Sequence, residues 1–257
     1  GACSSCRFED ITVDYDNQTV NTEVGFSVGP RELYAANSNN DLHEFYRCRV
    51  PGYDRAAFRV NGSQCHALLF DGCQAPNYSG KGQHGFSFDF GCYAHLRRCM
   101  FSGNKVSDVQ VAGNAVILRA EGCNSELSHA FLTTSNSAAS WPIDISFLRW
   151  EGLGVGGAIE NRPVIGNGHR GPLTISNSVI GTPLGGQPEI GINTAGVLRL
   201  DRTAFTTWAD PAGRAIVRAW GKGVDAKSDA CTLTWVRPGE PEWPGFKVPG
   251  DPTNPIQ

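Results

Sequence analysis

Three side chains able to transfer protons stand at similar places in the sequence. His84, Asp108 and His129 each precede a short run that is rich in apolar residues. Imidazole and carboxylate groups often act as general acids and bases. If the three runs are neighbouring strands, adjacent members of the set would lie about 5 Å apart. The spacing therefore predicts a catalytic site for acid–base chemistry made of these three residues.

Charged and aromatic residues occur near His84, Asp108 and His129, which would form one column of side chains along neighbouring strands. These residues suggest what the column would bind. Arg55 and Arg162 precede apolar runs in the same way, while Arg59 and Asp89 fall in a second outward column. Guanidinium groups bind carboxylates and sulfates with two parallel hydrogen bonds, and Tyr78 offers a ring for stacking. The predicted binding residues are thus Arg55, Arg59, Asp89, Arg162 and Tyr78. The alternative is that polar residues at the start of a strand are simply solvated, and the column is ordinary surface.

A repeat in the sequence indicates which elements would position these residues. The pattern apolar-x-x-small-x-apolar recurs in steps of 24 to 28 residues, and its small position is often cysteine. The successive positions from residue 48 onward are Cys48, Cys73, Cys99, Cys123, Trp150, Ser178, Thr203 and Cys231. A period of this length predicts a solenoid. Apolar residues alternate within the repeat, as in Phe86-Ser-Phe88, so its elements should be strands and not helices.

Each repeat has room for three short strands separated by tight corners. Two-residue corners are predicted at Asp71-Gly72, Arg97-Arg98, Glu121-Gly122 and Asp201-Arg202. From about residue 3 to 233 the chain resembles the right-handed parallel β-helix family, which includes pectate lyases, polygalacturonases, alginate epimerases and phage tailspikes. The resemblance implies an all-β, single-stranded right-handed parallel β-helix of about nine rungs. We expect residues 1–235 to form it and the proline-rich tail 236–257 to cap its last rung; a flexible linker is the alternative for the tail.

The resemblance also implies a class of ligand. In the related enzymes a polysaccharide lies along the face of the first strand, so the expected function is carbohydrate binding, with lyase or glycoside hydrolase chemistry if the protein is an enzyme. The sequence has no paired aspartates of the polygalacturonase kind, no calcium cluster of the pectate-lyase kind and no Asp-Pro-His motif. No cofactor is expected, although calcium is possible. The alternative is a non-catalytic structural or adhesive module that associates end to end or as a side-by-side trimer. Either function suggests an extracellular location or a cell or virion surface.

Composition and cysteine spacing argue against nucleic-acid binding, a membrane span and a metal site. The 22 basic and 25 acidic residues give no basic face for nucleic acid, and no apolar run is long enough to span a membrane. Cys48, Cys73, Cys99 and Cys123 should stack in the interior as free thiols, as should a second pair, Cys65 with Cys92. The Cys3-Ser-Ser-Cys6 spacing suits a zinc or redox motif, but no second pair accompanies it, so no metal site is expected. Because the chain begins within a rung pattern, we expect upstream residues or self-association to cover that end.

Overall fold

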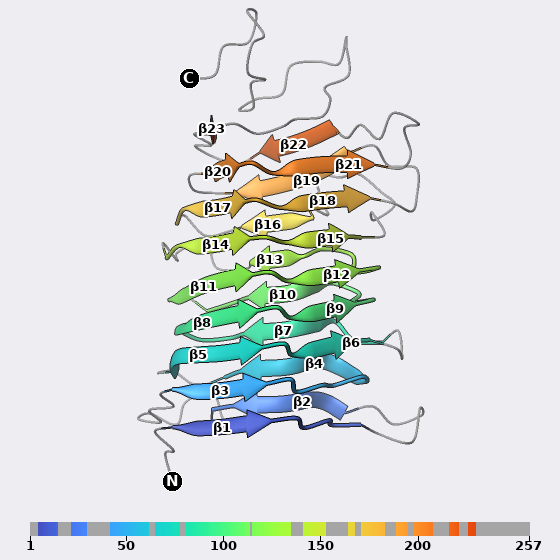
Figure 1. The fold of residues 1–257 in the computed structure, drawn as a ribbon, viewed down its shortest axis with the longest axis vertical. Coiled ribbons are helices and arrows are strands. Elements are labelled where there is room, and N and C mark those ends of the chain that lie inside the picture. The colour runs from blue at the N-terminus through green and yellow to red at the C-terminus, as the bar shows by residue number, and fades with distance from the viewer. Residues whose placement is uncertain are drawn as a thin grey trace, which may run out of the picture.

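The computed structural model describes residues 5–14, 22–29, 42–61, 65–77, 81–113, 115–134, 141–152, 164–167, 171–182, 189–194, 198–207, 216–220 and 226–229. Within these ranges all the regular secondary structure consists of β-strands, which form three parallel sheets. Figure 1 shows successive passes of the chain stacked along one axis. The fold is a parallel β-solenoid of about five turns, with further strands that extend single sheets at its ends. The predicted count of nine rungs and the right-handed winding remain predictions.

Each sheet takes one strand from each pass of the chain. The nine-stranded sheet contains β1 (Cys6–Glu9), β3 (His43–Tyr46), β5 (Cys65–Asp71), β8 (Cys92–Arg97), β11 (Val116–Glu121), β14 (Ile143–Ser146), β17 (Leu173–Ser176), β20 (Leu198–Asp201) and β23 (Ala226–Asp229). The six-stranded sheet contains β6 (Gln74–Pro76), β9 (Met100–Ser102), β12 (Asn124–Glu126), β15 (Arg149–Glu151), β18 (Val179–Thr182) and β21 (Ala204–Thr207). The eight-stranded sheet contains β2 (Thr22–Val28), β4 (Tyr53–Val60), β7 (His84–Phe88), β10 (Ser107–Val111), β13 (Leu132–Thr134), β16 (Ile165–Asn167), β19 (Glu189–Thr194) and β22 (Ile216–Trp220). In the described part of the chain, no helix has the length and apolar character needed to cross a membrane.

The corner between the nine-stranded and six-stranded sheets repeats one backbone conformation. In eight successive passes the corner residue has a positive φ of 44 to 65°. These corner residues are Asp10, Arg47, Gly72, Arg98, Gly122, Phe147, Asn177 and Arg202. The corner N–H donates to the next pass, as from Gly72 N to Arg97 O at 2.8 Å. The two-residue corners predicted from the sequence are confirmed, and the left-handed backbone explains why glycine recurs there.

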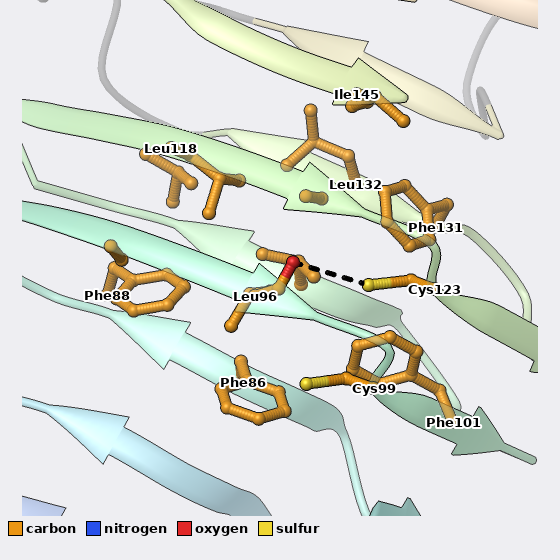
Figure 2. Close-up of a cluster of buried hydrophobic side chains, with 14 of the residues drawn as sticks. Phe86, Phe88, Leu96, Cys99, Phe101, Leu118, Cys123, Phe131, Leu132 and Ile145 are labelled. Carbon is orange, nitrogen blue, oxygen red and sulfur yellow. Dashed lines mark hydrogen bonds between the residues drawn. The ribbon is translucent and has the colours of Figure 1, made fainter. Parts of the chain in front are cut away.

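The interior is filled by columns of identical or similar side chains. Phe26, Phe58 and Phe86 stack with ring centroids 5.2 and 4.5 Å apart, and Phe45 stacks on Phe70 at 4.8 Å. The two columns meet edge to face, as between Phe58 and Phe70. Figure 2 shows phenylalanine and leucine side chains from the different sheets converging on this interior. Such ring contacts add to the hydrophobic effect of burial.

From the Arg47 corner onward, the residue after each corner faces inward and forms a second column. Cys48, Cys73, Cys99 and Cys123 are all buried and free, as predicted. Each thiol lies near a carbonyl of the preceding pass: Cys73 Sγ is 3.4 Å from Phe45 O, and Cys123 Sγ approaches Leu96 O (Figure 2). Thr203 continues the same contact with its hydroxyl, 3.2 Å from Ile175 O. Cysteine and threonine at these positions thus combine a small side chain with a hydrogen-bond donor, which is weak in cysteine.

Two positions in the predicted repeat need correction. The residue after the Phe147 corner is Leu148, which is buried in the cysteine column, whereas Trp150 lies one sheet further on, paired with Ser125 and Ile180. Cys6 does not belong to the cysteine column, because it lies in β1 opposite His43 and is disulfide-bonded. The predicted pairing of Cys65 with Cys92 in neighbouring passes is confirmed.

Candidate functional site

The strand register separates the three residues predicted to be catalytic. His84 on β7 pairs with Ser107 on β10, not with Asp108. Val109 pairs with Leu132, the first residue of β13, so the residue level with Asp108 is Phe131, just before β13, and not His129. His129 is half-buried, and its backbone N–H donates to Asn104 O at 3.0 Å. The three side chains therefore do not form one outward column.

A kink at the start of each strand explains why counting residues misplaced Asp108. At least three consecutive residues are buried here in four successive passes, at 56–58, 84–88, 107–109 and 130–132, where strict alternation would bury every second residue. We infer the kink from this burial pattern. A Cβ on Gly85 would point at the Phe101 ring, 2.8 Å from its Cδ1. The strict alternation of inward and outward side chains therefore begins one residue later than the sequence suggested.

Asp108 belongs to a hydrogen-bonded network inside the solenoid. Asn104 Nδ2 donates to one carboxylate oxygen at 2.9 Å and Ser125 Oγ donates to the other at 2.6 Å. The buried Tyr53 hydroxyl reaches the Asn104 side-chain oxygen in turn. Burial raises the pKa of Asp108 to about 7, although hydrogen bonds from Ser125, Ser128 and Asn104 oppose the rise. The carboxyl group is fully enclosed, so it cannot meet a ligand.

His84 does face a groove on the outer surface of the eight-stranded sheet. The groove has a volume of about 460 Å³ and is lined by residues from β2, β4, β10 and the start of β7, namely Glu23, Asp54, Arg55, Gln83, His84 and Gln110. Arg55 and His84 are thus brought together as predicted. Glu23 and Gln83 are additions that sequence reasoning missed, although Gln83 directly precedes His84. Asp54, which directly precedes Arg55, also lines the groove.

A hydrogen bond holds the His84 ring in place, and its surroundings keep the ring uncharged. Its Nδ1 lies 2.9 Å from Ser107 Oγ, which in turn lies 2.8 Å from Thr133 Oγ1. Burial, followed by the positive charge of Arg55, lowers the pKa of His84 to about 4. The imidazole is therefore neutral near pH 7, with one nitrogen able to donate and one able to accept.

The two predicted arginines on this face are bound to acidic neighbours. Arg59 Nε donates to Asp89 at 2.6 Å, and both side chains are largely buried. Arg55 is more exposed, with Asp89 at 3.6 Å and Glu23 at 3.8 Å. Ser87 Oγ donates to the second Asp89 oxygen at 2.7 Å. Asp89 thus neutralises positive charge on this face and holds Arg59 in place.

The remaining predicted residues and the comparisons with known proteins add no further residue to the description of this groove. Arg162 and Tyr78, like the tail 236–257, lie outside the described residues. Among the described residues, no cluster of three or more His, Cys, Asp or Glu side chains could hold a metal ion. Comparisons with known protein families, with curated proteins and with solved structures give no match. The chemistry of this site therefore has to be argued from its own residues.

Proposed function

We propose that this protein is a glycan-binding β-solenoid that holds a neutral, hydroxyl-rich segment of a polysaccharide in the groove beside His84. The observation that carries the proposal is the mixture of groups lining the groove. Gln83 and Gln110 can each donate and accept hydrogen bonds, neutral His84 offers its Nε2 while its Nδ1 is bonded to Ser107, and Asp54 and Glu23 can accept them. Vicinal hydroxyl groups, which also both donate and accept, are the ligand chemistry that such a surface fits.

The balance of charge favours a neutral sugar over a uronate. Arg55 faces Glu23 and Asp89, and Asp54 adds a further exposed carboxylate beside it. The carboxylate of an acidic sugar would be repelled by these acidic side chains, and the positive charge of Arg55 is already balanced by Glu23 and Asp89. Neutral oligosaccharides should therefore bind more tightly than oligomers of uronic acid.

We further propose that the protein binds the glycan without cleaving it. Glycoside hydrolysis normally needs two carboxyl groups that flank the scissile bond. Asp108, one of the predicted acid–base residues, is enclosed in the interior, and of the two carboxylates that line the groove, Glu23 already faces Arg55. His84 has no carboxylate hydrogen-bonded to its Nδ1, whose neighbour is Ser107. A non-catalytic role agrees with the structural or adhesive alternative, and we place the protein outside the cell or on a cell or virion surface. A solenoid that continues to nine rungs and self-associates would extend this surface.

The test is titration of the protein with a panel of neutral and acidic oligosaccharides, followed by NMR and calorimetry. Replacing Gln83, whose side chain is exposed in the groove, by Ala should weaken binding of a neutral oligosaccharide between about twofold and tenfold, as expected for one lost hydrogen bond. The matched control is Gln74→Ala on the six-stranded sheet, which should bind as the parent does.

Two results would overturn the proposal. Equal effects of Gln83→Ala and Gln74→Ala would remove the groove from binding. Release of new reducing ends that stops in His84→Gln would show that the site is catalytic.

A further inference from the structure

A second hollow lies at a different corner of the solenoid, between the nine-stranded and six-stranded sheets. It has a volume of about 320 Å³ and is lined by Arg97, Arg98, Glu121, Gly122 and Phe147. These residues lie at or just after the ends of β8, β11 and β14, which are strands of three successive passes. None of them lines the groove beside His84, so this hollow is a separate surface.

Phe147 is an unusual residue for its position. It occupies the left-handed corner with φ of 52°, where the other seven residues are Gly, Asn, Asp or Arg. A bulky side chain at positive φ is strained, and strain of this kind clusters at functional sites. Burial does not repay the cost, because 59 % of Phe147 is exposed. The ring therefore faces solvent at a position where a smaller residue would be easier to accommodate.

Gly122 leaves space beneath this ring. It is the corner residue of the preceding pass, between Arg98 and Phe147 in the corner column. Around a Cβ placed on Gly122, the nearest described atoms all belong to Arg98, with Cγ at 3.6 Å. No described atom of Phe147 lies within 4 Å of that point. Since neighbouring passes are about 4.8 Å apart, a flat ring can lie over Gly122 with one face toward Phe147.

The floor of the hollow carries an excess of positive charge. The buried carboxylate of Asp71 accepts hydrogen bonds from both Arg97 and Arg98, including 2.9 and 2.7 Å bonds from Arg98. Glu121 lies 3.2 Å from both His95 Nε2 and an Arg119 nitrogen. The lining itself thus holds two guanidinium groups and one carboxylate, and with their partners Asp71 and Arg119 the count is three guanidinium groups to two carboxylates. Asp71 also fixes the two arginines that line the hollow, so they are ordered before any ligand arrives.

We propose that this corner hollow binds a planar aromatic anion of about the size of a nucleoside monophosphate. The aromatic ring stacks on Phe147 above Gly122, and the anionic group contacts the outer nitrogens of Arg97 and Arg98. Offset stacking on an aromatic face and charge-assisted hydrogen bonds to guanidinium groups provide the two parts of the affinity. This inference does not depend on glycan binding in the groove.

Three probes separate the contributions of ring and charge. Adenosine 5′-monophosphate has both groups, adenosine has the ring alone, and ribose 5-phosphate has the anion alone. Calorimetry and amide NMR shifts should show the monophosphate binding most tightly, with shifts centred on Gly122 and Phe147. Each of the other two should bind at least threefold more weakly.

Variants at the same corner assign the contacts. Asn occupies this conformation naturally at position 177, so Phe147→Asn and Gly122→Asn should fold. The first removes the stacking surface and the second fills the space above the backbone; each should weaken monophosphate binding roughly tenfold. Arg202→Asn changes an exposed residue two corners further along and is the matched control, with unchanged binding. Thermal unfolding of each variant checks that it is folded.

Several outcomes would overturn the proposal. Equal binding of ribose 5-phosphate and the monophosphate, with no loss in Phe147→Asn, would make the hollow a simple anion site. Binding of a neutral oligosaccharide here, lost in Phe147→Asn, would assign it to glycans instead. Absence of binding by all three probes at millimolar concentration would leave Phe147 with no ligand of the proposed class.

Discussion

At the scale of single residues, two buried aspartates show how surroundings decide the charge of one side-chain type. Burial acts to raise the pKa of Asp71, but hydrogen bonds from Arg98 and Arg97 outweigh it and lower the pKa to about 2. Asp108 accepts its bonds from neutral groups, and burial raises its pKa to about 7. Asp71 is thus a fixed anion that orders a surface corner, whereas Asp108 can exist as a neutral acid inside the core.

The buried thiols lead to a prediction about reactivity. Cys48, Cys73, Cys99, Cys65 and Cys92 are buried together with Cys123, and burial raises the pKa of Cys92 and Cys99. The thiolate is the reactive form, and hydrogen bonds from Cys48 and Cys99 lower the pKa of Cys73, but burial keeps a reagent away from every one of these sulfur atoms. A thiol reagent should therefore leave all six unlabelled in the native protein and label them after denaturation. Peptide mass spectrometry assigns each label. Labelling of Cys99 at the rate of an exposed thiol would contradict the interior column.

At the scale of elements, the kink at the start of β7 gives a sharp prediction. A Cβ on Gly85 would lie 2.8 Å from Asp108 O and from the Phe101 ring. Replacing Gly85 by Ala should therefore lower the free energy of unfolding by roughly 1–3 kcal/mol, as overpacking of a core does. Urea unfolding measures the change.

Gly91→Ala is a suitable comparison for this variant. Its added Cβ would approach the Ala115 Cβ at 3.1 Å, a milder conflict, so the loss should be smaller. An equal or smaller loss for Gly85→Ala would mean that the kink has room to relax.

The same kink marks the limit of what the sequence predicts. A regular period of 24 to 28 residues identified the solenoid, its corners and the buried cysteine column, because each depends on one residue type recurring at one spacing. The Asp108 position depends on whether the strand starts at residue 107 or 108, and neither choice changes the pattern of apolar residues. Arg55 and His84 were placed correctly beside one groove, whereas Glu23 comes from a pass whose repeat pattern was too irregular to align. Site geometry needs single-residue register, which a repeat of variable length does not supply.

At the scale of the whole molecule, stability is expected to accumulate pass by pass, since each turn of a solenoid contacts mainly its neighbours.

His84 and Asp108 lie in adjacent passes, on opposite faces of the eight-stranded sheet. Their pKa values move in opposite directions from the ordinary values, to about 4 for His84 and about 7 for Asp108. Their effects on the pH dependence of folding should therefore be opposed.

The sign of each effect follows from proton binding. Between pH 4 and 6.5, His84 takes up a proton in the unfolded chain but not in the folded one, so its contribution to stability falls as the pH is lowered. Over the same range Asp108 is protonated in the folded protein and ionised in the unfolded chain, so its contribution falls as the pH is raised. Each slope is at most about 1.4 kcal/mol per pH unit, and the two cancel.

We therefore expect His84 and Asp108 together to add almost no slope to the unfolding free energy of the parent protein from pH 4 to 6.5, which leaves the contribution of groups such as His95, whose pKa burial lowers. Asp108→Asn keeps a polar group in the interior network and should expose the His84 slope, with stability rising by up to about 3 kcal/mol over this range. His84→Gln should show the reverse, with stability falling as the pH rises toward 7. The double variant should return to the slope of the parent, because both opposed groups are gone and only groups common to all four proteins, such as His95, still titrate.

Urea unfolding of the four proteins at half-unit pH steps measures these slopes. If the slopes of the single variants were the same in sign, the two groups would not be opposed. If both variants kept the slope of the parent, Asp108 and His84 would titrate alike in the folded and unfolded states, and the buried position of each side chain would be wrong. Opposite slopes would instead place one neutral acid inside the solenoid and one neutral base at its outer groove. The groove would then keep the uncharged imidazole that hydrogen bonding to sugar hydroxyls requires across this whole pH range.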